Sequence, residues 1–546
     1  SYTGEALDKK TPLLRSMVAI DEQANRVLKL FGEGHQKVVT TVGAEQEYFL
    51  ISEKDYAKRL DLVLTGRTLF GYPPCKGQEL EEHYFGAIRP TVNEFMKELD
   101  DELWKLGVSA KTKHNEVAPA QHELAPIFSN SNRAIDENLL TMEKMKLLAS
   151  HHGLVCLQHE KPFEGINGSG KHNNWAISAG KKNLLDPGEN PMENLRFLVF
   201  LTGVIQAVDD YQELLRMSVA SAGNDHRLGA NEAPPAIMSI FLGDQLTEVV
   251  EKIIDGKASV HATRGVLDLG ADTLPKLMQD NTDRNRTSPF AFTGNKFEFR
   301  ACGSEQNVSD SNLVLDAAVA KSLKSFADAL EGTPEDEFQD AALEYCKKVL
   351  TDHQRILFSG DGYSDEWPAE AEKRGLLNFK SAADAFPHYV DQKNLDLFAK
   401  HNVYTSAEIY SRMETQLEEY NKILHIEAMT MSDMVREEIT PACIAFENEL
   451  AGTVNAKKAA GVSGGMEAGL LGKVSELTEE LYTKSAALDE AVAAVPTDDN
   501  EKAAHYYHDV VISAMDEVRA PADKLEGLVG KKFWPFPTYS DILFYV

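Results

Sequence analysis

Acidic side chains recur at two-residue spacing in segments that have the composition of β-strands. On a strand, residues i and i+2 share a face. Glu45 and Glu47 would therefore point together, and so would His114 and Glu116, with Glu123 seven residues farther on. We expect these side chains to meet on one face of a sheet.

A later segment repeats the pattern with a cation beside the acid. In Lys296-Phe297-Glu298-Phe299-Arg300, the alternation directs both aromatic side chains to the core. Glu298 and Arg300 then face the opposite side, where Glu298 joins the other glutamates.

A sheet face with this many carboxylates needs counter-charge. Like charges repel strongly in a partly desolvated site, and divalent cations would resolve that repulsion. Oxygen-rich sites that include an imidazole suit Mg²⁺ or Mn²⁺ bound together with a substrate phosphate. A single glutamate of this kind is more often a solvated strand residue, so the prediction of a metal site rests on the whole constellation.

A glycine-rich segment follows the strand-like run at 154–157 and reads Gly165-Ile166-Asn167-Gly168-Ser169-Gly170-Lys171-His172. Most of a phosphate-binding P-loop is present, but His172 replaces the Ser or Thr that would hold Mg²⁺. The next residues, Asn173-Asn174-Trp175, are a poor start for the helix that a P-loop requires. A P-loop NTPase is therefore a minor alternative. We favour a turn that offers N–H groups to an anion and His172 to a metal, and a plain tight turn is the other possibility.

Arginines form the third group of candidates. They lie in segments rich in Gly, Asn and Pro, which are typical of loops: Arg227, Arg284, Arg286 and Arg300. Although an isolated loop arginine is more often a surface charge, guanidinium groups beside a metal cluster suit carboxylate and phosphate recognition.

The elements that must position these residues alternate between strand and helix up to about residue 300. A strand is predicted at 37–51, and helical periodicity recurs near 88–106, 132–152 and 191–218. Thr11 and Pro12 predict the start of an amphipathic helix that ends at Gly32. We expect an N-terminal helical segment over 1–36 and an α/β or α+β catalytic domain with a curved sheet over 37–330.

The remaining chain, residues 331–546, is predicted to be a helical extension. Stretches at 405–452, 473–495 and 500–528 are rich in Ala, Glu, Lys and Leu at helical period, and Pro441 should kink or split the first. Glycines between 461 and 469 predict a flexible connection, and the aromatic segment 533–537 should dock on another surface. We expect the extension to be interaction surface rather than a site of chemistry.

Composition excludes several functional classes. The net charge of −30 argues against nucleic acid as the main partner, and the most apolar run, 197–208, is too short to cross a membrane. The five cysteines are scattered without paired spacing. This pattern favours reduced thiols in a cytoplasmic protein.

The motifs together resemble the active-site segments of the glutamine synthetase family, in the family's order. The matching segments are Gly43 to Glu47, Asn115 to Glu123, Asn167 to His172, Arg227 to Pro234, Asn285-Arg286 and Phe297 to Arg300. The residues in these segments, together with the long helical C-terminus, most closely resemble those of type III glutamine synthetases. The resemblance implies an α+β fold with a curved antiparallel sheet that forms a partial barrel.

The same resemblance implies a role for each candidate. One cation, Mg²⁺ or Mn²⁺, would be held by Glu47, Glu116 and Glu123, and a second by Glu45, His172 and Glu298. L-glutamate would be bound by Asn167, Gly168, Arg227 and Arg300. ATP would be contacted by Arg286, Asn174 and His114. Glu232 corresponds to the family's acidic residue that takes a proton from ammonium or from the adduct, and Arg286 would also contact the transferring phosphate.

The implied reaction is ATP-dependent ligation of ammonium to glutamate through γ-glutamyl phosphate. Family sites lie between subunits, which implies two stacked hexameric rings. Family members also carry a β-grasp region before the first Glu-x-Glu strand; 44 residues precede Glu45 here, so we expect that region to be missing. The alternatives are the P-loop NTPase, a γ-glutamyl ligase acting on another amine, and a catalytically silent relative.

Overall fold

The computed structural model describes residues 4–229, 233–256, 266–267, 277–278 and 287–544. Its main sheet runs in the order β2-β3-β1-β6-β12-β11-β8 without closing on itself. The strands on this path are β1 (Val38–Ser52), β2 (Ala110–Asn115), β3 (Gln121–Pro126), β6 (Lys171–Ala179), β8 (Ile240–Phe241), β11 (Phe290–Phe292) and β12 (Phe297–Phe299). Shorter strands are β4 (Ser129–Asn130), β5 (Leu154–Leu157) and β7 (Lys182–Asn183), and a separate pair is β9 (Val266–Leu267) and β10 (Leu277–Met278).

The strand pairs described are antiparallel except for β8 with β11, which is parallel. The predicted α+β fold with a curved antiparallel sheet, a partial barrel, is confirmed as an α+β fold whose sheet does not close and is antiparallel except for this one parallel pair. The sheet has no simple strand–helix–strand repeat, because antiparallel neighbours need no crossover helix.

The long strand β1 separates a helix-covered face from a polar face. Its even positions, Val42, Ala44, Tyr48 and Leu50, are buried among the apolar residues of the helices. The covering helices are α1 (Lys10–Leu30), α4 (Pro90–Lys105), α5 (Ser131–Ala149), α6 (Leu195–Asp210) and α10 (Ser309–Leu330). The odd positions Glu45 and Glu47 consequently lie on the opposite face.

Two predicted helix boundaries need correction. The first helix begins at Lys10 rather than after Thr11, because the Asp8 carboxylate accepts a hydrogen bond from the Thr11 N–H and so satisfies the helix start. The predicted helix at 191–218 is two helices, α6 and α7 (Gln212–Ser218), because Tyr211 leaves the helical conformation.

Shorter helices complete the part of the chain before residue 406. They are α2 (Glu53–Tyr56), α3 (Leu60–Thr65), α8 (Ala222–Arg227), α9 (Asp244–Ile254), α11 (Phe338–His353), α12 (Trp367–Lys373), α13 (Ala382–Ala385) and α14 (Gln392–Lys400). Single turns of 3₁₀ helix lie at η1 (Ser150–His152), η2 (Pro191–Glu193), η3 (Gln354–Ile356) and η4 (Phe386–Val390).

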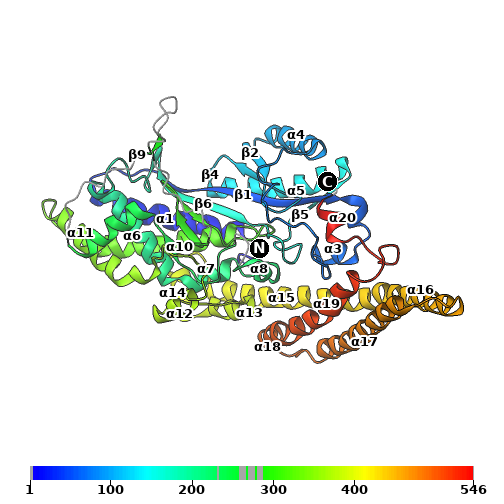
Figure 1. Cartoon of the computed structure of the whole chain (residues 1–546). Helices are drawn as coiled ribbons and strands as arrows, with labels where there is room; N and C mark the ends of the chain where they lie inside the picture. Colours follow the sequence, from blue (N-terminus) through cyan, green and yellow to red (C-terminus); the bar gives the residue numbers. More distant parts are fainter. Residues whose placement is uncertain (1–3, 230–232, 257–265, 268–276, 279–286, 545–546) are drawn as a thin grey trace.

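The C-terminal helices form a layer beside the rest of the molecule (Figure 1). The layer consists of α15 (Ser406–Met434), α16 (Thr440–Ala459), α17 (Gly465–Ala493), α18 (Asn500–Tyr506) and α19 (Ile512–Glu526), whereas the last helix, α20 (Tyr539–Leu543), packs against β1. A π-helical turn at Val435–Ile439 divides α15 from α16 just before Pro441, as expected of a residue that removes a helix hydrogen bond. The predicted glycine connection is shorter than expected, because Gly465 and Gly469 belong to α17.

The aromatic segment at 533–537 docks on the rest of the chain, which confirms the prediction that it packs against another surface. Phe536 stacks under the Arg59 guanidinium at 4.6 Å, and Arg59 Nη1 donates to the Pro537 carbonyl at 2.9 Å. Farther on, the Tyr539 hydroxyl accepts a hydrogen bond from the Glu164 backbone N–H at 3.0 Å. The C-terminus thus returns from the helical layer to the loop that precedes Asn167. Among the described helices, none combines the length and apolar character needed to cross a bilayer.

A buried carboxylate joins α10 to the sheet and gives the fold a pH dependence. Asp316 is fully buried and accepts hydrogen bonds from Thr40 Oγ1 and Trp175 Nε1, each at 3.0 Å. Burial raises the pKa of Asp316 to about 7. The folded state therefore binds this proton more tightly than the unfolded state, so its contribution to stability is present below about pH 4 and is lost as pH rises toward 7.

We predict that Asp316→Asn reduces this loss. Because the amide stays neutral at every pH, the variant should gain relative to wild type by up to about 1.4 kcal/mol per pH unit between pH 5 and 7. Thermal melts of both proteins at pH 5, 6 and 7 measure the gain as a difference in Tm. A Tm difference that stays constant with pH would contradict the prediction.

Candidate functional site

Neighbouring elements of the sheet carry the six candidate metal ligands. Glu45 and Glu47 lie on β1, Glu123 on β3, His172 on β6 and Glu298 on β12, and Glu116 follows β2 directly. The register sets Glu45 opposite His172 and Glu47 opposite Glu123. Segments that are far apart in sequence therefore meet on one polar face.

Glu45, His172 and Glu298 form one compact group, with one potential ligand atom from each within 4.8 Å of the others. His172 Nδ1 lies 2.8 Å from Glu298 Oε1 and 3.3 Å from Glu45 Oε2. Burial lowers the pKa of His172, but the hydrogen bond to Glu298 and both carboxylates raise it to about 10. The protonated imidazole supplies the positive charge that this carboxylate pair requires, which a divalent cation would supply equally well.

His114, Glu116 and Glu123 form a second group with the same spacing of ligand atoms. His114 Nε2 lies 3.0 Å from Glu123 Oε1, and Nδ1 lies 3.5 Å from Glu116 Oε1. The hydrogen bond to Glu123 raises the pKa of His114 to about 9. His114 therefore lies among the carboxylates of this group, and its predicted contact with the nucleotide stays a prediction. Its two-residue spacing from Glu116 was the sequence signal for this position.

Glu47, expected with Glu116 and Glu123, lies beside this second group rather than within it. It faces Glu123 across the strand pair, and its Oε2 accepts a hydrogen bond from the Gly170 N–H at 2.7 Å. Burial is the main cause of the raised pKa of Glu123, and the charges of Glu45 and Glu47 add to it. Carboxylate oxygens with imidazole nitrogens are donors that Mg²⁺ and Mn²⁺ accept, so the residues present fit two such ions.

Asn167 and Gly168 lie in a tightly packed loop before β6. A Cβ at Gly168 would lie 2.4 Å from the Glu160 carbonyl oxygen, and one at Gly170 would lie 2.2 Å from Arg227 Nη2. Only glycine fits at position 168, where the clash is with backbone, whereas a side chain at 170 would have to displace the Arg227 guanidinium. The loop, which the sequence marked by its glycines, is therefore shaped by close backbone contact with its neighbours.

Arg227 ends helix α8 and is held against the segment after β12. It is 3% exposed, and its Nη1 lies 3.3 Å from the carbonyl oxygens of both Arg300 and Cys302. These contacts fix the guanidinium beside Gly170. The structure thus brings Arg227 to the glycine-rich loop, as the resemblance implied, with its donors directed at backbone carbonyls.

Asn174 and Arg300 lie beside the group formed by Glu45, His172 and Glu298. Asn174 Nδ2 donates to Glu45 Oε1 at 2.9 Å, and Arg300 Nη2 donates to Glu298 Oε2 at 3.2 Å. Burial raises the pKa of Glu298, but His172 and Arg300 bring it well below its ordinary value. This carboxylate is held ionised, as a metal ligand must be.

Gln78 is a contact residue that sequence reasoning missed. Its Oε1 accepts a hydrogen bond from the Asn167 N–H at 3.1 Å, and its Nε2 donates to Asn167 Oδ1. Gln78 lies in an irregular segment before α4, and neither periodicity nor a motif distinguishes it. Only the fold reveals that it fixes the Asn167 side chain.

Lys171 does not occupy the position that a P-loop requires. Its side chain is fully buried, and Nζ donates to the Gln306 carbonyl. Residues 171–179 form a strand rather than a helix, so no helix N-terminus meets a phosphate here. The P-loop alternative is not supported.

Three sequence candidates lie outside the described residues: Glu232, Arg284 and Arg286. Their assignments stay predictions from the sequence. The described part of the site therefore covers both carboxylate groups and the loop at 167–170, with Arg227 and Arg300 beside them.

Comparison with known proteins agrees with the geometry. Residues 22–239 match the model of the glutamine synthetase catalytic domain, and residues 341–458 match the glutamine synthetase C-terminal domain. A glutamine synthetase from Butyrivibrio fibrisolvens is 48% identical over all of this chain and 78% of its own length. A type-3 glutamine synthetase from Dictyostelium discoideum is 45% identical over all of this chain and 75% of its own length, and a glutamine synthetase from Bacteroides fragilis is 41% identical, with 76% of its length covered. The chain belongs to the glutamine synthetase family.

Proposed function

We propose that this ligase joins ammonium to the γ-carboxylate of L-glutamate with ATP as the phosphoryl donor. The observation that carries the proposal is the pair of carboxylate–imidazole groups on one sheet face, next to the loop at 167–170. Such an arrangement suits phosphoryl transfer, in which positioning and neutralisation of phosphate charge supply most of the catalysis.

Two divalent cations would be held on this face. Glu45, His172 and Glu298 would hold one, and Glu116 and Glu123 the other, with Glu47 adjacent. His114 would either contribute to the second site or give up its proton when the ion binds. When bound, the cations supply charge neutralisation for the ATP phosphates. Mg²⁺ and Mn²⁺ both suit these donors.

Glutamate would bind at the loop beside these groups. Asn167 and the Gly168 backbone offer hydrogen bonds, and Arg227 and Arg300 offer positive charge for its carboxylates. The γ-carboxylate oxygen would attack the γ-phosphorus of ATP, with ADP as the leaving group. This step forms γ-glutamyl phosphate.

Ammonia would then complete the reaction. It attacks the acyl carbon of γ-glutamyl phosphate, and inorganic phosphate leaves as glutamine forms. We propose the Glu232 carboxylate as the base that takes a proton from ammonium or from the adduct that ammonia forms. On the basis of the family motifs, Arg286 would lie at the transferring phosphate, and Asn174 with Arg286 near the nucleotide.

We further propose a cytoplasmic enzyme of stacked hexameric rings, a dodecamer, with the chain divided at residues 36 and 330. Mass photometry of the purified protein measures the assembly. A single species at twelve times the chain mass of 60.5 kDa supports it, and a monomer opposes it.

The function itself is tested by measuring glutamine and ADP with and without each substrate. Equal amounts of glutamine and ADP, formed only when glutamate, ammonium and a divalent cation are all present, support the proposal. ADP formation that is indifferent to glutamate would contradict it. Product formed from glutamate and methylamine, but not from ammonium, would favour a ligase for another amine.

Gln78 gives a prediction about substrate affinity. Gln78→Ala removes both hydrogen bonds between Gln78 and Asn167, so the Asn167 side chain is held less firmly in position for the substrate. We expect the KM for glutamate to rise about tenfold, the effect of about 1.4 kcal/mol, with kcat changed less than threefold. Steady-state kinetics measure KM and kcat. Gln36→Ala, which changes a partly buried glutamine far from the loop in sequence, serves as control. An unchanged KM would contradict the positioning role.

A further inference from the structure

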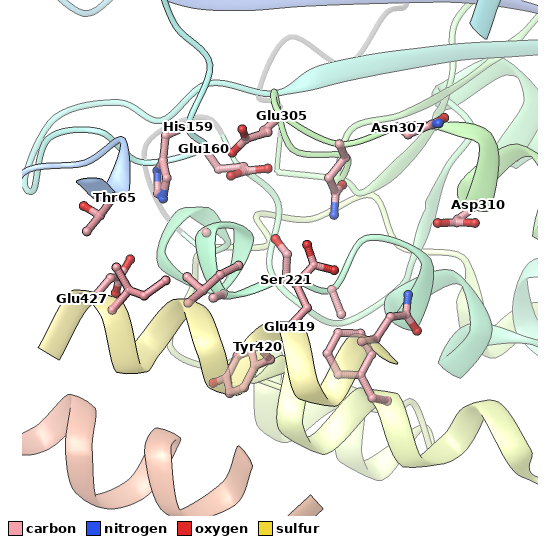
Figure 2. A pocket seen from close by; sticks show the side chains of 18 of the residues that line it. Thr65, His159, Glu160, Ser221, Glu305, Asn307, Asp310, Glu419, Tyr420 and Glu427 are labelled. Carbon is pink, nitrogen blue, oxygen red and sulfur yellow. The ribbon is translucent and has the colours of Figure 1, made fainter. Parts of the chain in front are cut away.

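A cavity lies between helix α15 of the C-terminal layer and the residues that precede the loop at 167–170 (Figure 2). Its volume is about 470 Å³, within the range of sites for small molecules. Figure 2 shows α15 along one side, with Glu419 and Glu427 on it, and Glu160 and Glu305 on the opposite side. None of the proposed metal ligands or glutamate-binding residues lines it.

The lining has an excess of negative charge. Two of its acids are balanced: Asp310 pairs with Lys9, and Glu427 pairs with Arg67 through bonds of 2.8 and 2.7 Å. His159 contributes no compensating charge, because burial lowers its pKa to about 3. The remaining acids are Glu160, Glu305 and Glu419.

Glu160 is the strongest indication of a ligand. It is 3% exposed, and among the described residues no side chain forms a hydrogen bond or ion pair with its carboxylate. Burial and the charge of Glu305 raise its pKa to about 7, although the charges of Lys171 and Arg227 act in the opposite direction. A buried carboxylate in this state is stabilised by a cation that enters the cavity.

The other two acids lie toward the solvent. Glu305 and Glu419 are exposed, and Glu305 has Lys146 only at 3.8 Å, a weak surface contact. The lining also includes apolar side chains such as Ile423 and Ala222. The cavity thus offers negative charge on two facing sides, at Glu160 with Glu305 and at Glu419 on α15, together with apolar surface.

We propose that this cavity binds an aliphatic diamine and that its occupancy changes the affinity of the glutamate site. A chain of methylenes would cover the apolar surface, with one ammonium at Glu160 and Glu305 and the other at Glu419 across the cavity. A bare metal ion fits less well, because these carboxylates do not form one of the compact ligand groups in the described chain. An anion is opposed by the charge.

The cavity is connected to the substrate loop by direct contacts. The Glu160 carbonyl accepts a hydrogen bond from the Ser169 N–H at 2.8 Å. Ser221 and Gly223, which line the cavity, belong to the start of α8, and α8 ends at Arg227. A Cβ at Gly223 would lie 2.3 Å from Glu160 Oε2, so the carboxylate packs closely against the start of this helix.

The test is calorimetric titration of the full chain with 1,4-diaminobutane, beside the neutral isostere 1,4-butanediol. Wild type should bind the diamine and not the diol. The double variant Glu305→Gln/Glu419→Gln, which changes exposed residues, should bind at least about tenfold more weakly, and Ile423→Trp, which fills the cavity, should not bind. Glu418→Gln, the neighbouring exposed position on α15, is the matched control and should bind like wild type.

Kinetics separate this site from the active site. The diamine should change the KM for glutamate at least about twofold in wild type but not in Ile423→Trp. Absence of binding, equal binding of the diol, or unchanged affinity in the double variant would overturn the proposal. Glutamine synthesis in the absence of diamine tests the proposed function independently, so the two can fail separately.

Discussion

Replacing Glu298 by Gln should reduce the rate of glutamine formation by about a thousandfold while the protein stays folded. Glu298 connects the candidate metal ligand His172 to the candidate glutamate-binding residue Arg300. One of its oxygens lies 2.8 Å from His172, and the other accepts a hydrogen bond from Arg300 at 3.2 Å. The amide keeps the shape but removes the charge that a divalent cation requires. A loss of about 4 kcal/mol of transition-state stabilisation corresponds to this factor.

Glutamine formation at saturating substrates measures the Glu298 effect. Glu143→Gln, which removes an exposed charge from α5, is the control and should be as active as wild type. Thermal melts should show both variants folded. A Glu298→Gln protein that is folded and keeps more than about a tenth of wild-type activity would show that this carboxylate does not support the reaction.

Replacing Arg59 by Met should destabilise the protein by about 3–5 kcal/mol, the loss typical when one partner of a buried ion pair is removed. Arg59 and Asp61 are both fully buried and joined by bonds of 3.0 and 2.6 Å. Arg59 also donates to the carbonyls of Phe70 and Pro537. The substitution therefore leaves a buried carboxylate without its counter-charge and two carbonyls without a donor.

Urea denaturation and limited proteolysis near the C-terminus measure the Arg59 effect. Lys58→Met is the matched control, since the neighbouring Lys58 is half exposed and lies 3.9 Å from its nearest acid. Arg59→Met/Asp61→Leu should recover part of the stability, because no charge is then left buried alone. Equal stability of the Arg59 and Lys58 variants would contradict the account of how the C-terminal tail is anchored.

The sequence identified most of the site because strand periodicity is a local property. Glu45 and Glu47 lie on one face, as two-residue spacing requires, and Phe297 and Phe299 are buried while Glu298 points toward His172. The helical extension was also predictable, since its period is regular over long stretches. Pro441 marked the break between α15 and α16 for a known steric reason.

Other features depend on tertiary contacts that no local pattern encodes. Gln78 reaches Asn167 from an irregular segment, and Glu160 is buried only because α8 and the glycines around it pack closely. The contact of His114 with Glu123 depends on the register of β2 with β3, which the spacing of His114 and Glu116 alone does not give. The docking of the aromatic tail was predictable, but its target, Arg59, was not.

The fate of one glutamate oxygen tests the central claim most directly. The enzyme would be supplied with glutamate whose γ-carboxylate carries a heavy oxygen isotope, together with ATP and ammonium, and the released phosphate analysed by mass spectrometry. Transfer of one heavy oxygen to phosphate for each glutamine formed is the predicted result, because the γ-carboxylate attacks the γ-phosphorus. Phosphate without the heavy isotope would mean that water attacks ATP instead, and would contradict glutamine synthesis through γ-glutamyl phosphate.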